Sequence, residues 1–147
     1  MPSTHLSLHY HIIFSTKGRR RSIADPWRKD LHAYLGGIVR DLGGAPTSVG
    51  GPGDHVHALI RLKATHAVAD VVRDMKRGSS LWIHQHGVTK FEWQEGYGAF
   101  TVSASQTAKV QAYIENQVEH HRKQTFEEEY IELLRRSGLE FDEKYLW

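Results

Sequence analysis

The sequence predicts an α+β protein in which helices pack on a mainly antiparallel sheet. Three observations lead to this class. Apolar and polar residues alternate over residues 6–15, a helical pattern of apolar residues follows residue 25, and a compact apolar run surrounds two histidines at residues 55–60. In order, the chain gives strand, helix, two strands, helix, strand and helix, with no internal repeat and no credible linker between domains.

The first strand and the first helix are separated by a basic turn. The alternation over residues 6–15 predicts the strand, and the turn occupies residues 17–21. Asp25 is the expected N-cap of the helix, followed by Pro26 at the first helical position, where a missing N–H is tolerated. Gly43-Gly44 marks the expected end of this helix.

The middle of the chain contains two strands and a second helix. A short strand is expected near residues 45–49, and the apolar run at residues 55–60 predicts a buried strand. The second helix should extend from about residue 65 to about residue 86. Its inward positions are expected to be Val68, Val71, Val72, Met75 and Trp82.

The C-terminal third contains a strand and two helices. Residues 97–103 predict the strand, and Ser105 is the expected cap of the helix that follows. Thr125 and Glu128 have the spacing of a capping box, so a last helix should begin there and end at Gly138.

Composition narrows the class of protein without indicating a function. A length of 147 residues predicts one domain over residues 1–147, with a helical tail from about residue 125. The lack of cysteine excludes a disulfide framework and a thiolate zinc site, and it is compatible with the cytoplasm. No signal peptide is expected, and no apolar run approaches the roughly 20 residues that cross a bilayer. The formal charge of +2 does not by itself indicate nucleic-acid binding, whereas eleven histidines offer many metal ligands.

Two short motifs carry the chemistry. His55 and His57 are alternate residues of a strand, so both imidazoles project from one face and can share a cation. Tyr113 and Gln117 are four residues apart in a helical stretch and also point the same way. A two-imidazole metal site that faces a helix-borne tyrosine is what metal-assisted attack of tyrosine on a phosphodiester requires. Taken singly, the histidines are more often a hydrogen-bonded strand pair and the tyrosine a core aromatic.

Several neighbouring side chains have two interpretations. His9, His11 and His121 are rival metal ligands, or else polar-face histidines and nucleic-acid contacts. Asp54 either supports a ligand imidazole through a hydrogen bond or forms the turn before the strand. The acidic residues 127–129 are interpreted as the first turn of the last helix, where negative charge is favourable.

Basic and aromatic side chains outline a candidate DNA surface. Exposed rings such as Trp93 and Tyr97 can stack on unpaired bases, whereas Phe100 is expected in the core. For each basic residue taken alone, an ordinary solvated surface is the alternative. The candidate phosphate contacts are Lys17, Arg19, Arg20, Arg21, Arg73, Lys76 and Arg77.

In this order the motifs resemble the single-tyrosine HUH transposases of the smallest insertion sequences, together with their domesticated repeat-associated relatives. The likeness extends through residues 11–21, 54–57, 76–82, 93–100 and 113–121. The family pattern has a bulky hydrophobic residue between the two histidines, as this chain does. Several spaced matches in one order are far more specific than a lone His-x-His.

The resemblance implies a ferredoxin-like or RNA-recognition-like sandwich with DNA transposase activity. The family attacks single-stranded DNA at hairpin-bearing element ends and forms a 5′-phosphotyrosine with a free 3′-hydroxyl. On this chain the nucleophile would be Tyr113, and Gln117 matches the position of the third metal ligand beside His55 and His57. An amide oxygen suits a hard ion, which favours Mg²⁺ or Mn²⁺.

The resemblance also implies partners. Relatives in mobile elements form homodimers in which the tyrosine helix of one subunit faces the histidines of the other, and a monomer with both halves in cis is the alternative. We expect hairpin-bearing single-stranded DNA as the partner, no membrane, and a cytoplasmic location that is nucleoid-associated when DNA is bound. Two other functions stay open, namely a replication or conjugation HUH nuclease and a non-catalytic nucleic-acid-binding module.

Overall fold

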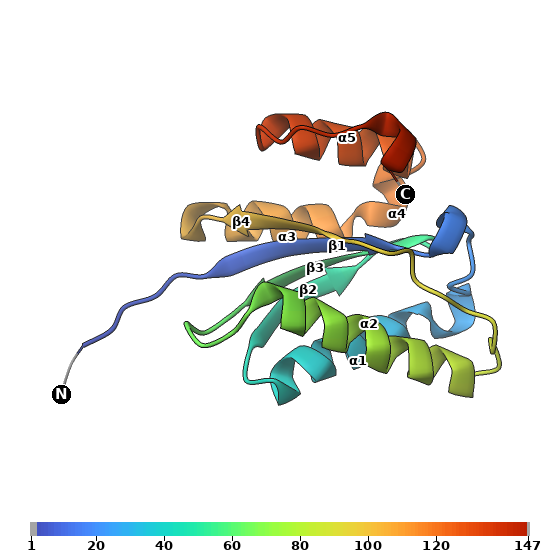
Figure 1. The fold of residues 1–147 in the computed structure, drawn as a ribbon, viewed down its shortest axis with the longest axis horizontal. Helices are drawn as coiled ribbons and strands as arrows, with labels where there is room; N and C mark the ends of the chain where they lie inside the picture. Colours follow the sequence, from blue (N-terminus) through green and yellow to red (C-terminus); the bar gives the residue numbers. More distant parts are fainter. Residues whose placement is uncertain (1–2, 147) are drawn as a thin grey trace.

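A computed structural model describes residues 3–146, so residues 1, 2 and 147 of the expected 1–147 domain lie outside the described part (Figure 1). Within the described part, four strands form one antiparallel sheet in the order β2-β3-β1-β4. The strands are β1 (His9–Ser15), β2 (Ala45–Gly50), β3 (His55–Arg61) and β4 (Gly98–Val102).

Helices cover both faces of this sheet. On one face lie α1 (Asp25–Asp41) and α2 (Val68–Gln85), and on the other lie α3 (Thr107–Glu115), α4 (Gln117–His120) and α5 (Phe126–Arg136) (Figure 1). The chain order β1-α1-β2-β3-α2-β4, with β1 and β3 at the centre of the sheet, is that of a ferredoxin-like sandwich. The expected fold class is therefore confirmed. Short 3-10 turns occur at Lys17–Arg19, Ala104–Gln106 and Glu143–Tyr145.

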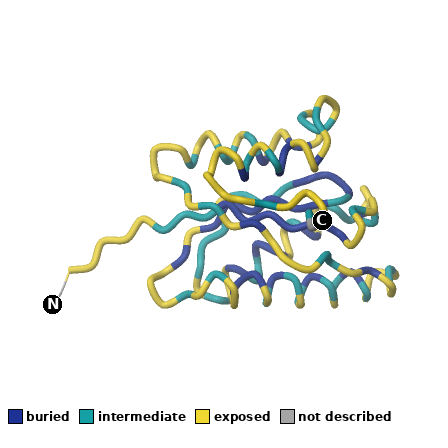
Figure 2. The backbone as a smooth tube through the Cα atoms, turned by 45° about the horizontal axis from the view of Figure 1, so that its top comes forward, coloured by how far each residue is buried: buried dark blue, intermediate teal, exposed yellow. Residues whose placement is uncertain are grey.

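The first strand is shorter than its alternating pattern indicates. It begins at His9 rather than at Leu6, because the partner strand β3 ends at Arg61, which pairs with His9. Residues 3–8 lead away from the sheet, and Leu6 is 52% exposed (Figure 2). Residues 11–15 are all buried, since helices cover both faces of the strand.

Two of the three expected helix caps are wrong. Asp25 is itself the first residue of α1, which has no side-chain cap. Ser105 lies inside the 3-10 turn before α3, where a backbone hydrogen bond of the turn takes the place of a side-chain cap. Thr125 does cap α5, because its hydroxyl accepts a hydrogen bond from the Glu128 N–H at 3.2 Å.

The two faces of the sheet differ in character. The face under α1 and α2 carries the larger hydrophobic core, which includes Ile12, Phe14, Val56 and Met75. The opposite face has a smaller cluster, formed by Ile13 with Phe126, Tyr130 and Leu134 of α5. The second face also carries the buried polar side chains His11, Ser15, His55 and His57. Buried polar groups are costly unless they are hydrogen-bonded, so the partners of these side chains indicate where a site lies.

Close packing of α3 on the sheet depends on Gly50 at the end of β2. A Cβ atom at this position would lie 2.8 Å from the Ile114 carbonyl oxygen and 2.9 Å from Ile114 Cγ2. Ile114 is 1% exposed and follows Tyr113 directly. The missing side chain of Gly50 therefore sets how closely the helix that carries Tyr113 approaches the sheet.

Replacing Gly50 with alanine should force α3 away from β2 and lower the free energy of unfolding by about 1–3 kcal/mol, as overpacking typically does. Gly37→Ala is the matched control, because a Cβ in that part of α1 meets nothing within 4 Å. Helical alanine there should instead stabilise the protein by about 0.4–1 kcal/mol. Equilibrium urea unfolding measures both, and a Gly50→Ala protein as stable as wild type would show that α3 does not need this close approach.

Candidate functional site

Two buried imidazoles on β3 form the base of the site. His55 and His57 are both 0% exposed. A hydrogen bond joins His55 Nδ1 to Asp54 Oδ1 at 2.7 Å, and another joins His57 Nδ1 to His11 Nε2 at 2.7 Å. Each ring is held through Nδ1, so both Nε2 atoms are directed toward side chains of α4 and α5.

Gln117 reaches the same space from α4. Its Oε1 atom lies 3.2 Å from His55 Nε2. The sequence predicts one continuous helix through Tyr113 and Gln117, but Asn116 leaves helical geometry between α3 and α4, with φ −100° and ψ 17°. Asn is a common residue where helices end. The two side chains are therefore not on one helical turn, yet both contact the carboxylate of Glu129.

Glu129 completes the site from α5, a role that the helix-dipole interpretation of residues 127–129 does not predict. Its side chain is 2% exposed. The Oε1 atom lies 2.9 Å from His57 Nε2 and 3.5 Å from His55 Nε2. The Oε2 atom accepts a hydrogen bond from the Tyr113 hydroxyl and another from Gln117 Nε2 at 3.2 Å.

The acidic run at residues 127–129 is divided between the surface and the site. Glu127 and Glu128 are exposed in the first turn of α5, as the helix-dipole interpretation requires, whereas Glu129 points inward. Glu129 lies three residues after Phe126 and next to Tyr130, and both of these are buried. A carboxylate on the apolar stripe of an amphipathic helix is the sequence signal that identifies it.

The contacts set the charges of the cluster. Burial lowers the pKa of His57 to about 4 and that of His11 to about 3, so both rings are neutral near pH 7. Burial acts on His55 as well, but hydrogen bonds to Asp54 and Glu129 outweigh it and raise the pKa of this ring. Burial alone would raise the pKa of the Glu129 carboxyl, yet hydrogen bonds from the surrounding histidines hold it well below its usual range. Glu129 is therefore an anion at neutral pH.

This group of side chains can bind a metal ion. His55, His57, His121 and Glu129 each offer one ligand atom, and these atoms all lie within 4.8 Å of one another. Imidazole nitrogens with a carboxylate are ligands of divalent transition metals, and Asp54 supports the far nitrogen of His55 as such sites usually require. A cation bound at His55 would compete with the proton that the raised pKa of this ring favours. Of the rival ligands, His121 belongs to the group, His11 orients His57, and His9 lies outside it.

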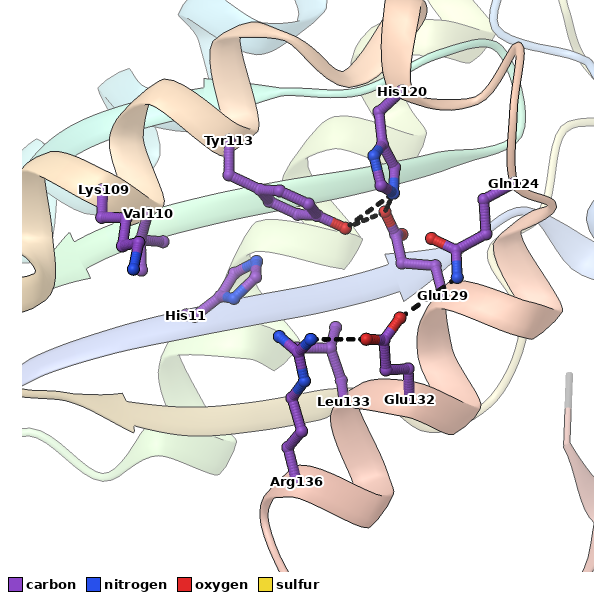
Figure 3. A pocket seen from close by; sticks show the side chains of 10 residues that line it. All are labelled: His11, Lys109, Val110, Tyr113, His120, Gln124, Glu129, Glu132, Leu133 and Arg136. Atoms are coloured by element: carbon purple, nitrogen blue, oxygen red, sulfur yellow. Dashed lines mark hydrogen bonds and ion pairs between the residues drawn. The ribbon is translucent and has the colours of Figure 1, made fainter.

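Tyr113 lies beside this group and lines a cavity of about 360 Å³ (Figure 3). Its hydroxyl donates a hydrogen bond to Glu129 Oε2 and lies 3.4 Å from His120 Nε2. The Tyr113 and His57 rings meet edge to face, with centroids 5.7 Å apart. Burial and the hydrogen bond to Glu129 raise the pKa of Tyr113 above its usual range, so the phenol keeps its proton near neutral pH.

Comparison with known proteins identifies the family. The sequence pattern of the family described as "Transposase IS200 like" matches residues 4–117. The chain belongs to this family. Among solved structures, a Deinococcus radiodurans protein assigned as a transposase is similar, with a TM-score of 0.64 and 26% identity over 80% of this chain and 96% of that chain. A REP-associated tyrosine transposase bound to a REP hairpin is also similar, with a TM-score of 0.56 and 13% identity over 84% of this chain and 74% of that chain.

The expected resemblance to a transposase family is thus confirmed, and the REP-associated transposase shows a shared fold. No curated protein sequence matches the chain. The IS200-like match ends at Gln117, so His120, His121 and all of α5, including Glu129, lie beyond it. Among residues 3–146, no helix has the length and apolar character needed to cross a membrane.

The basic candidates of this IS200-like protein form two groups. The first lies in the turn at residues 17–21 and the second on α2, and side chains of both line one pocket. Lys17 from the first group and Lys76 and Arg77 from α2 line a pocket of about 430 Å³, together with Trp93. The Lys76 ammonium donates hydrogen bonds to two backbone carbonyl oxygens of the loop before β4. Three of the seven candidates pair with acidic side chains, namely Lys17, Arg19 and Arg73.

Arg20 and Arg21 of the basic turn lie in different places. Arg20 lines an adjoining pocket with Lys17, whereas Arg21 lies against Gly53, next to Asp54 in the chain. The aromatic candidates separate into core and surface. Trp93 packs edge to face on Phe14, and Phe100 packs in the cluster under α5, while Tyr97 is 37% exposed.

Changing Asp54 to asparagine keeps the size of the side chain but removes the charge that holds His55. We expect Mn²⁺ affinity to fall about 10–100-fold, the usual effect of removing a group that orients a ligand imidazole. Calorimetric titration of metal-free protein with Mn²⁺ measures this change. Asp70→Asn, at an exposed residue of α2, is the control and should leave the affinity unchanged. Equal affinities for Asp54→Asn and wild type would mean that Asp54 does not support a metal ligand.

Proposed function

We propose that this member of the IS200-like family cleaves and rejoins single-stranded DNA at hairpin-bearing element ends through a 5′-phosphotyrosine intermediate. One observation carries the proposal. The Tyr113 hydroxyl and the imidazoles of His55 and His57 all contact the carboxylate of Glu129. A tyrosine beside a group of metal ligands is suited to phosphodiester attack. The hairpin bound by the REP-associated transposase of the same fold supports DNA hairpins as partners.

The proposed reaction needs no external energy source, because one phosphoester bond forms for each one that breaks. The Tyr113 oxygen attacks phosphorus while the bond from phosphorus to the 3′ oxygen breaks, so the phosphate passes to tyrosine. The phenol loses its proton and the 3′ oxygen gains one, which leaves a free 3′-hydroxyl. Attack by another 3′-hydroxyl on the tyrosine ester rejoins strands, because the ester keeps the energy of the broken bond. A bound divalent ion would polarise the phosphoryl oxygen and stabilise its charge.

Glu129 contacts the proposed nucleophile directly. While its carboxylate accepts the hydrogen bond from Tyr113, the hydroxyl is directed at α5. An incoming phosphate needs this same hydroxyl and the neighbouring histidines. The hydrogen bond also places a carboxylate where it can take the phenol proton as the Tyr113 oxygen attacks.

The proposed metal ligands are His55, His57 and Gln117, with His121 and Glu129 close enough to join them. Mg²⁺ and Mn²⁺ are the proposed ions, and the imidazole nitrogens favour Mn²⁺. The seven basic candidates, of which Lys17, Lys76 and Arg77 line the pocket beside Trp93, remain the proposed phosphate contacts. We also propose that residues 1–147 act as one domain in the cytoplasm, associated with the nucleoid when DNA is bound.

Two assemblies can complete this site. Within one chain, α3 brings Tyr113 to the Glu129 and His57 of the same chain, which supports a site in cis. The homodimer with sites in trans stays a prediction. In that assembly α3 would be exchanged between subunits, with the turn at Ala104–Gln106 as its hinge.

Tyr113→Phe removes one oxygen and little volume, so the fold should persist while the covalent adduct is lost. We expect the yield of adduct on labelled single-stranded hairpin ends to fall by at least about 10³-fold, as loss of a nucleophile does. Denaturing electrophoresis measures the yield, and Tyr97→Phe, outside the site, is the control. Excess chelator should have the same effect on wild type. Adduct formation by Tyr113→Phe would assign the nucleophile to another tyrosine, and no adduct from wild type would favour a non-catalytic binding module.

Mixing two inactive subunits separates the two assemblies. His57→Ala keeps Tyr113, and Tyr113→Phe keeps His57, so neither homodimer should cleave. In a mixed dimer with sites in trans, one site receives both defects and the other receives neither. We expect co-expressed, purified heterodimers to recover about half of the wild-type cleavage rate. Verified heterodimers that stay inactive would place both halves of the site in one subunit.

A further inference from the structure

We propose that the cavity between α3 and α5 receives one unpaired nucleobase of the DNA strand, beside the phosphate that Tyr113 attacks, and that it prefers cytosine to thymine. This inference rests on the proposed function and names what the site recognises next to the cleaved bond. The cavity of about 360 Å³ has the size of a small-ligand site. Tyr113 lines it, so a bound base would lie next to the nucleophile (Figure 3).

The inner wall of the cavity suits the flat face of a base. His11 lies on β1 and is 4% exposed, and its ring centroid lies 6.4 Å from that of Tyr113 in an edge-to-face arrangement. Val110 of α3 and Leu133 of α5 add aliphatic surface from the two helices (Figure 3). Rings and apolar groups bind unpaired bases by stacking and contact, whichever base is present.

An exposed carboxylate that lines the cavity provides the means to choose between bases. Glu132 of α5 accepts hydrogen bonds from Gln124 Nε2 at 3.2 Å and from Arg136 Nη2 at 2.5 Å (Figure 3). These two bonds hold the carboxylate at the cavity while lone pairs remain on both oxygens. Cytosine offers an exocyclic amino group to such an acceptor, whereas thymine presents a carbonyl oxygen at the same position.

The charges favour a base inside the cavity and the DNA backbone outside it. Glu129 and Glu132 both line the cavity, so a neutral group is a better occupant than a second phosphate beside the one that Tyr113 attacks. Lys109 of α3 and Arg136 of α5 also line it and are exposed to solvent. Arg136 is paired with Glu132, whereas the Lys109 cation is available to the phosphates of a strand that passes over the opening. A neutral base in the cavity satisfies both conditions.

The test compares oligo(dC) and oligo(dT) of equal length, which differ in the group offered to Glu132. Fluorescence anisotropy gives the affinities, with Tyr113→Phe protein throughout so that the strands are not cleaved. We expect oligo(dC) to bind about tenfold more tightly than oligo(dT). Glu132→Gln should bring the ratio of the two affinities close to one, because an amide can donate to the thymine carbonyl. Val110→Phe fills the cavity and should weaken binding of both strands.

Two arginines of α5 supply a matched control. Arg136→Ala and Arg135→Ala remove the same charge, but only Arg136 lines the cavity and holds Glu132, while Arg135 lies over the Phe141 ring. Only Arg136→Ala should lower the ratio of the two affinities. Thermal unfolding checks each variant, and if Val110→Phe fails to fold, the ratio measured with Glu132→Gln decides.

The outcomes separate this inference from the function on which it rests. If wild type forms the covalent adduct but Glu132→Gln leaves the ratio unchanged, the base-binding cavity is wrong and the cleavage reaction stands. Equal affinities for oligo(dC) and oligo(dT) in the parent protein would overturn the base preference in the same way. If wild type forms no adduct with single-stranded hairpins, the proposed function fails, and this inference fails with it.

Discussion

The carboxylate of Glu129 is the interaction on which the rest of the site depends. Hydrogen bonds and ion pairs connect it to His57 on β3, to Tyr113 on α3 and to Gln117 on α4. A buried anion is costly unless every partner is in place, so one side chain constrains three separate elements at once. The rings of α5 pack that helix on the sheet, and the carboxylate then determines which part of the helix faces the histidines.

The sequence predicts those parts of the site that depend on short local patterns. Strand alternation is enough to place His55 and His57 on one face, and Asp54 is adjacent in the chain to the ring it holds. The other partners of His57 are distant in sequence. His11 lies 46 residues before it and Glu129 lies 72 residues after it. Contacts over such separations depend on strand register and on the docking of α5, which no short motif records.

The errors at the ends of elements have a related cause. A strand ends where its partner ends, which is why the alternating residues before His9 do not extend β1. The helix break at Asn116 is equally hard to foresee, because the residues around it suit a continuous helix. Element type and order depend on patterns of many residues, so they are predictable. Terminal residues depend on one or two tertiary contacts.

The register of the central strands has a consequence for folding. His57 lies opposite Ile13 and His55 opposite Ser15. A slip of β3 by one residue would turn both imidazoles into the apolar layer beneath α1 and α2 and bring Val56 to face Glu129. An ion that requires both imidazoles binds only the correctly paired sheet, and its free concentration then adds to the stability of that pairing by mass action. Bound metal would thus favour the native register over the slipped one before any DNA is bound.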